Sequence, residues 1–499
     1  MQLEFKKETF DWMPAIAGQV QTQEQTLELK LSDGMPDIGR VLGSWGQPVL
    51  RSKEWRGDSF SASGGMMVWV LYSPEDGTQP RFLSGWIPWQ LSWDLPEGVP
   101  DGQISVCCRT RFVDARWVSA RKVMVRAGIS VLGEAFAPDT YSVWTPREIP
   151  EDVQLLTNEY PLRMSLEAGE KAFYMEEELT LPGSCPVPAR LVSYSVRCRV
   201  PESRVLSGRV LFRGIAEVHV LYMNEEGQLF SWDFPVSISQ YEDLRGSFSQ
   251  DAQVEFRIEI TDLDIQLDDD GHFRMKAGVI AQYVVDDVRM IPVTEDAYSP
   301  VRDTESLQTE VTMTPVLDRC IREMAVQQVI PQDANVIADV RFLPDFPRQR
   351  RNGDRMELTQ TASVQILYCN PEGILQSSGT RWEGSVDLPL HPDALVQAVP
   401  AEGMAPEAQI TGEGIVLKGT LSVQICSTAR QTFSVVTQVD LGEDKERSPD
   451  RPSLVLCRAG DRSLWQLARE NGSTVAAIRD ATGLEGEPYP GQMLLIPVM

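Results

Sequence analysis

Histidine is scarce in this sequence, and its cysteines are not paired at metal-binding spacings. The only histidines are His219, His272 and His391, and the eight cysteines include no Cys-x-x-C pair. Scattered cysteines are typical of a reducing compartment, where most thiols are small core side chains. Neither a zinc cluster nor a Ser–His or Cys–His pair can be assembled from these residues. We therefore expect no catalytic residues, no metal and no cofactor.

Positive charge and long apolar runs are also lacking. The chain has 46 Lys and Arg against 72 Asp and Glu, a formal charge of −26. Such an excess repels a phosphate backbone, so we expect no nucleic-acid partner. No window approaches the roughly 20 apolar residues of a membrane helix, and the first residues, MQLEFKKETFDWMPAIAGQV, do not resemble a secretory signal. We expect a cytoplasmic protein with no transmembrane segment.

One ten-residue pattern occurs three times in the 499 residues. VWVLYSPEDG (68–77) returns as VHVLYMNEEG (218–227) and as VQILYCNPEG (364–373). At the 150-residue offset between Gly77 and Gly227, residues 36–128 align with 186–278 without a gap, while the third copy is looser. Repeats of this length indicate duplicated domains rather than short solenoid units.

Each copy has the pattern of β structure. The motif alternates like a half-buried strand and ends in turn residues, and VMVRAGISVLGEA (123–135) predicts another long strand in the same repeat. A catalytic role for the motif is disfavoured because Glu75 and Glu225 are matched by Pro371. We predict a mainly β fold with β-rich domains at 1–150, 151–310 and 311–443, a linker at 444–452, and a small module at 453–499.

The last residues follow a different pattern, strand–helix–helix–strand. Asn471-Gly472 can end the first helix and Ser473 or Thr474 can cap the second. The segment resembles the LysM module, a small βααβ unit, through residues at five places: Gly460-Asp461, Leu464-Trp465, Leu467-Ala468, Tyr489-Pro490-Gly491-Gln492 and Leu495-Ile496-Pro497. As the largest apolar side chain of the module, Trp465 is expected to be structural.

The resemblance to LysM modules places N-acetylglucosamine binding in two loops. The candidate partner- or glycan-binding residues there are Gly460, Asp461, Arg462, Ser463, Leu464, Thr482, Gly483 and Leu484. Two departures concern these loops: Arg462-Ser463 replaces a single residue, and Thr482 replaces a common asparagine. Sugar binding and protein binding both remain open for the module. We expect Arg462, Ser463, Thr482 and Gly483 to be exposed.

Repeated acidic β domains, with MPDIGRVLGSWG before the first strand motif and a terminal LysM, resemble the SPOCS-domain proteins of spore-forming Firmicutes. Among these the chain is most similar to the SipL-type spore morphogenetic proteins. The resemblance implies a scaffold in the mother-cell cytoplasm, recruited to the forespore surface during coat assembly. It also implies that the LysM binds the coat basement-layer ATPase (stage IV sporulation protein A), with other coat proteins as further partners.

Three hypotheses for function follow. The first is a non-enzymatic spore-coat scaffold that docks through its LysM. The alternative is a peptidoglycan-binding or N-acetylglucosamine-binding protein in which the β repeats form a stalk. A third, a glycan-active enzyme, requires a carboxylate pair in a cleft, and the sequence does not identify one.

Overall fold

The computed structural model describes residues 2–401, 406–445 and 452–499. The described residues form 26 strands and two short helices, and both helices lie after residue 460. The prediction of a mainly β fold is therefore confirmed. Neither helix has the length or apolar content to cross a bilayer within these residues. Residues 446–451 of the predicted linker lie outside the described part of the chain.

The first repeat is a sandwich of two antiparallel sheets. One sheet has the order β2 (Ala15–Lys30), β7 (Lys122–Phe136), β6 (Gln103–Ser119), and the other has β3 (Ile38–Arg56), β4 (Ser59–Pro74), β5 (Arg81–Asp94). Their inner faces share one core that includes Phe60, Tyr72, Trp93 and Val125. Tyr72 is fully buried and its hydroxyl donates to the Pro36 carbonyl at 3.2 Å.

The second repeat has the same strand order and pairing register. Its sheets are β9 (Gln154–Leu179), β14 (Phe273–Tyr298), β13 (Gln253–Leu267), and β10 (Arg190–Leu206), β11 (Arg209–Met223), β12 (Leu229–Asp243). In the first repeat Trp45 pairs with Trp69 across two strands, and Ser195 pairs with His219 at the equivalent place 150 residues later. The two repeats therefore share topology and register.

The third repeat is a variant of the same sandwich. One sheet contains β16 (Val316–Ile330), β23 (Gly414–Ala429), β21 (Ala394–Pro400) and the short β22 (Glu407–Thr411). The other contains β17 (Val336–Pro344), β18 (Arg348–Asn352), β19 (Arg355–Cys369) and β20 (Leu375–Pro389). Here the strand equivalent to β3 is split into β17 and β18, both of which pair with β19. Arg341 pairs with Gln365 where Trp45 pairs with Trp69.

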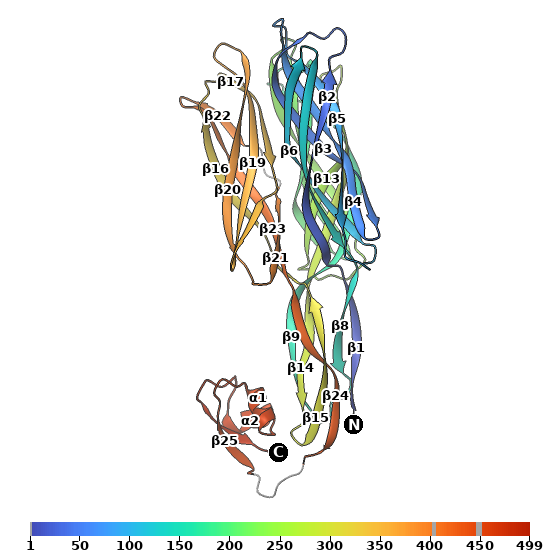
Figure 1. Cartoon of the computed structure of the whole chain (residues 1–499), viewed down its shortest axis with the longest axis vertical. Coiled ribbons are helices and arrows are strands. Elements are labelled where there is room, and N and C mark those ends of the chain that lie inside the picture. The colour runs from blue at the N-terminus through green and yellow to red at the C-terminus, as the bar shows by residue number, and fades with distance from the viewer. Residues whose placement is uncertain (1, 402–405, 446–451) are drawn as a thin grey trace.

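Below the three sandwiches lies a fourth body, which we call the base (Figure 1). Each repeat contributes the strands at its two ends. The first repeat contributes β1 (Gln2–Trp12) and β8 (Asp139–Pro146), and the second contributes the N-terminal half of β9 and the C-terminal half of β14. The third contributes β15 (Arg302–Met313) and β24 (Gln431–Asp444). The predicted boundary at residue 310 falls inside β15. Trp12, Met164, Ile291 and Met313 belong to the apolar core of the base.

The repeated motif forms a strand and a turn in all three copies. Gly77, Gly227 and Gly373 end these turns at φ values of 73°, 84° and 77°, which L side chains rarely adopt. The prediction of a half-buried strand is wrong, however, because both faces of the motif are buried at residues 68–72 and 218–222. One face packs on the core of its own repeat and the other packs on neighbouring repeats.

The C-terminal module consists of β25 (Leu454–Arg458), α1 (Leu464–Glu470), α2 (Val475–Thr482) and β26 (Met493–Pro497). β25 and β26 pair antiparallel, and Leu464, Leu467, Ile478 and Ile496 are fully buried between this two-stranded sheet and the helices. The module lies beside the base, at the opposite end of the molecule from the tips of the sandwiches (Figure 1).

Candidate functional site

The three repeats meet through equivalent positions of their sequences. Leu42, Val192 and Ala338 occupy one repeat position, and Leu71, Leu221 and Leu367 occupy another; all six lie in a single buried apolar cluster. The three copies therefore meet through equivalent surfaces. We call this region the three-repeat junction.

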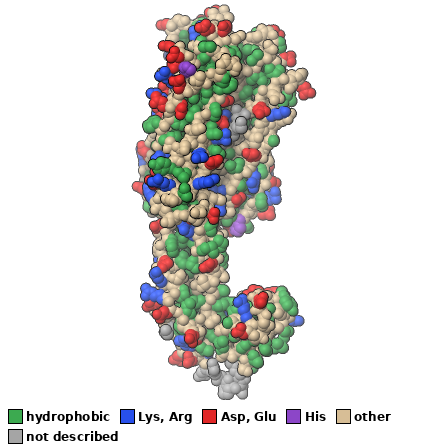
Figure 2. Space-filling view, turned by 180° about the vertical axis from the view of Figure 1, so that it is seen from behind, with side chains coloured by type: hydrophobic (Ala, Val, Ile, Leu, Met, Phe, Trp, Pro, Cys, Tyr) green, Lys and Arg blue, Asp and Glu red, His purple; other side chains and the backbone are tan. Residues whose placement is uncertain are grey.

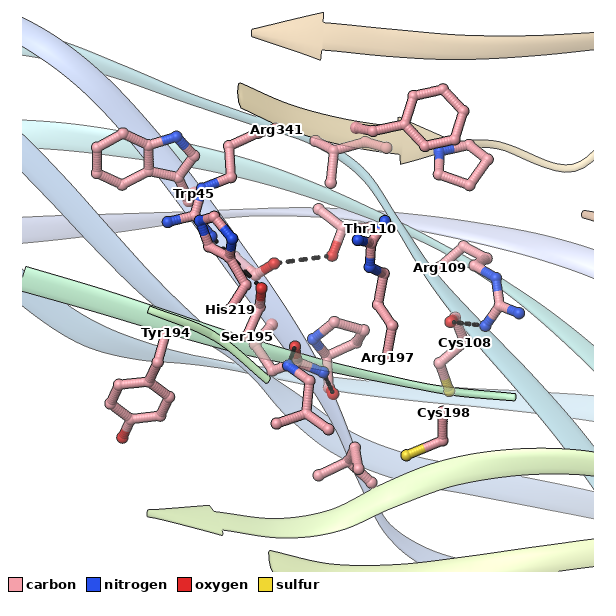
Figure 3. Close-up of a pocket in the computed structure, with 18 of the residues that line it drawn as sticks. Trp45, Cys108, Arg109, Thr110, Tyr194, Ser195, Arg197, Cys198, His219 and Arg341 are labelled. Atoms are coloured by element: carbon pink, nitrogen blue, oxygen red, sulfur yellow. Dashed lines mark hydrogen bonds between the residues drawn. The ribbon is translucent and has the colours of Figure 1, made fainter. Parts of the chain in front are cut away.

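A cavity of about 120 Å³ lies within the junction. Trp45, Ser195 and Arg341, again at one repeat position, line it together with residues of β6, β11 and β13. Figure 3 shows Trp45, Ser195, His219 and Arg341 gathered at one end of this cavity, and Arg109, Cys108 and Cys198 at the other. The cavity is therefore built by all three repeats and not by any one of them.

A chain of charged groups joins the second and third repeats here. His219 of β11 is hydrogen-bonded through Nδ1 to Asp233 Oδ1 at 2.7 Å and through Nε2 to Asp339 Oδ1 at 2.8 Å. Arg341 Nε donates to the other oxygen of Asp339 at 2.6 Å, and its Nη2 donates to Ser193 Oγ at 2.9 Å. The guanidinium also lies 5.3 Å from the ring centroid of Trp45, so the first repeat contacts the same group.

Burial and charge shift the pKa values of this network in opposite directions. Burial and the Arg341 cation oppose the charged form of His219, but Asp339 and Asp233 outweigh them and raise its pKa. Burial also works against ionised Asp339, yet Arg341 and His219 lower the pKa of that carboxyl well below its usual range. The protonated imidazole and the ionised carboxylate thus stabilise each other across the junction.

The sequence predicted His219 on the surface of a β-sheet. His219 does lie on the outer face of its own repeat. The third repeat covers that surface and leaves the side chain about 8% exposed. Because both ring nitrogens are engaged, His219 has no free atom with which to accept a substrate proton. Among the described residues there is also no group of three His, Cys, Asp or Glu side chains that could hold a metal ion. The geometry of the junction favours a structural role.

A second set of contacts joins the first and second repeats at a sheet edge. The Gln282 side chain accepts from Val106 N and donates to Val106 O, both at 2.8 Å, and so pairs with the backbone of β6. The Gln47 side chain accepts from Val196 N of β10 at 3.0 Å. Unpaired backbone groups at sheet edges are covered in this way by the neighbouring repeat.

The candidate residues of the C-terminal module have mixed environments. Gly460 and Asp461 are exposed at the turn after β25, whereas Leu464 is fully buried in the core. Ser463 caps α1: its hydroxyl accepts from Gln466 N, and the Gln466 side chain accepts from Ser463 N. Ser463, of the pair that replaces a single residue, therefore forms a capping box with Gln466.

Arg462 is only half-exposed and is bound within the module. Its guanidinium donates to the carbonyls of Arg458 at 2.6 Å and Ala459 at 3.2 Å, and to Glu470 Oε2 at 2.8 Å. The ion pair with Glu470 raises the pKa of Arg462. Arg462 thus fastens the β25–α1 turn to the end of α1, and the expectation that its side chain is freely exposed is wrong.

The second candidate loop is similarly organised around α2. The Thr482 hydroxyl donates to the Ile478 carbonyl at 2.6 Å, and Gly483 ends the helix at a φ of 67°. Leu484 is half-buried against the module core. Glu487 accepts from Leu464 N at 2.8 Å, which ties the segment after α2 to the start of α1. Gly483 is the residue of this loop that is exposed as expected.

Sequence reasoning missed a contact between the module and the base. Trp465 is half-buried and packs on the module core, and it also reaches the base. Its Nε1 donates to Asp296 Oδ2 at 2.7 Å, and its ring meets Tyr298 edge-on with centroids 4.8 Å apart. Arg469 donates to the same oxygen of Asp296 at 2.7 Å, and the Tyr298 hydroxyl donates to the Ser473 carbonyl at 3.0 Å. One face of α1 is therefore docked on the end of β14.

Comparison with known families gives one match. Residues 189–268, which span β10 to β13 of the second repeat, match the family model described as SipL, SPOCS domain. No curated protein matches the chain, and no solved structure does. The match covers part of one repeat, and it supports a relationship between this chain and the SipL-type sporulation proteins.

Proposed function

We propose that this chain is a non-enzymatic scaffold of spore coat assembly that works in the mother cell at the forespore surface. In this proposal the C-terminal module is a LysM module that docks on the coat basement-layer ATPase (stage IV sporulation protein A). The three repeats are SPOCS domains that contact other coat proteins. The match of the second repeat to the SipL SPOCS domain carries the proposal.

The architecture supports a scaffold because it fixes the spacing of its parts. The repeats are joined by a buried ionic network and a shared apolar cluster, which hold them together as one packed unit. The module sits beside the base, away from the tips of the sandwiches (Figure 1). A packed unit with separate binding surfaces gains affinity through multivalency, since each contact raises the local concentration of the next.

The module itself favours a protein partner over a sugar. LysM modules bind glycan through two loops. In these loops the side chains of Arg462, Ser463 and Thr482 form hydrogen bonds within the module. Polar groups that are already paired have little left to offer to sugar hydroxyls. This observation favours the scaffold over the glycan-binding alternative.

Binding of the purified chain to the purified coat ATPase and to chitin oligomers tests the proposal. We expect the ATPase to bind with a Kd in the micromolar range or tighter, and the oligomers not to bind. Pull-down from sporulating cells should recover coat proteins. Micromolar binding of chitin oligomers without any coat protein would overturn the proposal in favour of wall binding.

A further inference from the structure

The two-stranded sheet of the C-terminal module has one apolar face on which none of the described residues packs. In an antiparallel pair, residues directly opposite each other point to the same side. Val455, Cys457, Leu494 and Ile496 thus share the inner face, and Leu454, Leu456, Met493 and Leu495 share the outer face. These four outer side chains are between 38% and 65% exposed.

An aromatic side chain is exposed in the turn that precedes β26. Tyr489 in this turn is 68% exposed, and the turn is held by a hydrogen bond from Gln492 N to the Tyr489 carbonyl. Hydrophobic side chains lie along the outer side of the module in Figure 2. We call Leu454, Leu456, Met493 and Leu495 the sheet-face patch. Clustered apolar side chains of this kind mark interaction sites.

Two other parts of the module surface already have contacts. The outer face of α1 is docked on Asp296 and Tyr298 of β14. The two candidate loops are held by internal hydrogen bonds of Arg462 and Thr482. The sheet-face patch lies on the side of the module away from the helices and is the large apolar surface that these contacts leave open.

Charge indicates which kind of occupant fits. The residue of the outer face next to Met493 is Arg458, an exposed cation that pairs with no carboxylate among the described residues. An occupant with a carboxylate beside its apolar side chains would neutralise it. A second copy of this chain fits poorly, since each copy has a formal charge of −26. Such charge keeps like chains apart at low and physiological ionic strength.

We infer that the sheet-face patch, rather than the two loops, is the docking surface of the module. It takes a segment of a partner protein that presents aliphatic side chains next to an Asp or Glu, which pairs with Arg458. This assignment rests on the proposed function, in which the partner is the coat ATPase. The apolar contact supplies affinity, and the Arg458 pair sets the orientation of the bound segment.

The test compares full-length variants for binding to the purified coat ATPase. Leu456→Glu places a charge in the middle of the patch at a position that is 65% exposed, so the module stays folded. Leu395→Glu, at a 70% exposed position of β21, is the matched control. We expect Leu456→Glu and Arg458→Glu to weaken binding by about tenfold or more, and Leu395→Glu to leave it unchanged.

Each other outcome has a defined meaning. If the unmodified chain binds and Leu456→Glu binds equally well, the sheet-face assignment is wrong and the proposed function stands. If the unmodified chain does not bind the ATPase, the proposed function fails, and this assignment fails with it. Sedimentation of the chain alone completes the test. A dimer that Leu456→Glu dissociates would make a second copy the occupant and would overturn the choice of partner.

Discussion

His219 of the second repeat donates through Nε2 to Asp339 of the third repeat, across a distance of 2.8 Å. Asp339 also accepts from Arg341, whose guanidinium faces Trp45 of the first repeat. One carboxylate is thus linked, directly or through one neighbour, to all three copies of the repeated domain. The stability of their arrangement should depend on this group more than on any surface charge.

Asp339→Ala is expected to destabilise the three-repeat junction. The substitution leaves the buried cations of Arg341 and His219 without their shared carboxylate, and breaking a buried ion pair costs about 3–5 kcal/mol. Urea unfolding followed by tryptophan fluorescence should show an earlier first transition. Asp387→Ala removes an exposed carboxylate that lies 3.6 Å from Arg355 in the same repeat, and it should change stability by less than about 0.5 kcal/mol. Equal effects of the two variants would contradict the role of Asp339.

The contribution of His219 is expected to decrease as the pH rises. Its pKa is raised in the folded chain, so its stabilisation is complete below the usual histidine pKa of about 6.5. That stabilisation is lost as the pH passes the raised, folded-state pKa. Asp339 and Asp233 remain ionised over this range because their pKa values are lowered.

The free energy of unfolding of the chain and of His219→Gln should therefore differ more at about pH 6 than at about pH 9. Arg341 and Arg197 also act on the network, but arginine stays charged throughout this range. His391→Gln, at an exposed position of the third repeat, is the control and should leave stability unchanged at both pH values. A difference for His219→Gln that does not vary with pH would contradict this account.

Asp296→Ala is expected to release the C-terminal module from the base without unfolding it. The substitution removes the acceptor of both Trp465 Nε1 and Arg469, and hydrogen bonds to charged groups contribute about 1.5–3 kcal/mol. Hydrogen exchange should increase in α1 and at the end of β14, while the core residues of the module remain protected. Asp303 is an exposed acid on β15, and Asp303→Ala should leave hydrogen exchange unchanged in both α1 and the end of β14. Loss of protection throughout the module would show that Asp296 supports its folding instead.

Arg462→Ala is expected to destabilise the module itself. It removes donors to the Arg458 and Ala459 carbonyls and the ion pair with Glu470, so the melting temperature of the module should fall. Arg479→Ala, on the exposed side of α2, should have little effect on the melting of the module. Arg462→Glu should be worse than Arg462→Ala, because it places a second carboxylate beside Glu470. A module that melts like the unmodified one in all three variants would contradict the structural role of Arg462.

The periodicity of the sequence predicted the β class, and its internal repetition predicted the strands that recur. The relation between repeats was less visible, because Trp69, His219 and Gln365 differ chemically although they occupy one position facing the junction. One signal was present. In a half-buried strand, alternate side chains face solvent. The segments WVLY, HVLY and QILY have a leucine at such a solvent-facing position, and apolar residues on both faces are typical of strands buried on both sides. The partners Asp339 and Arg341 lie on another repeat, and no local pattern connects them to His219.

In the module, the spacing of Leu464, Leu467 and Ala468 predicted the first helix and its buried face. Trp465 packs on the module core, as expected for the largest apolar side chain of a small unit. Its indole N–H also meets a carboxylate of the base more than 160 residues away in sequence, and this contact was not predicted. The sequence of the module contains no sign of that acceptor, so the contact could not be derived from it.

The base has a consequence for synthesis of the chain. Leu3 of β1 pairs with Val439 of β24, so β1 is synthesised long before the strand that pairs with it. Each sandwich pairs its strands from its own residues and can fold as it emerges. Until β24 has been synthesised, one edge of β1 is unpaired. This edge can then form backbone hydrogen bonds with a strand of another nascent chain. Completion of the base thus marks the point at which the three repeats become a single closed unit.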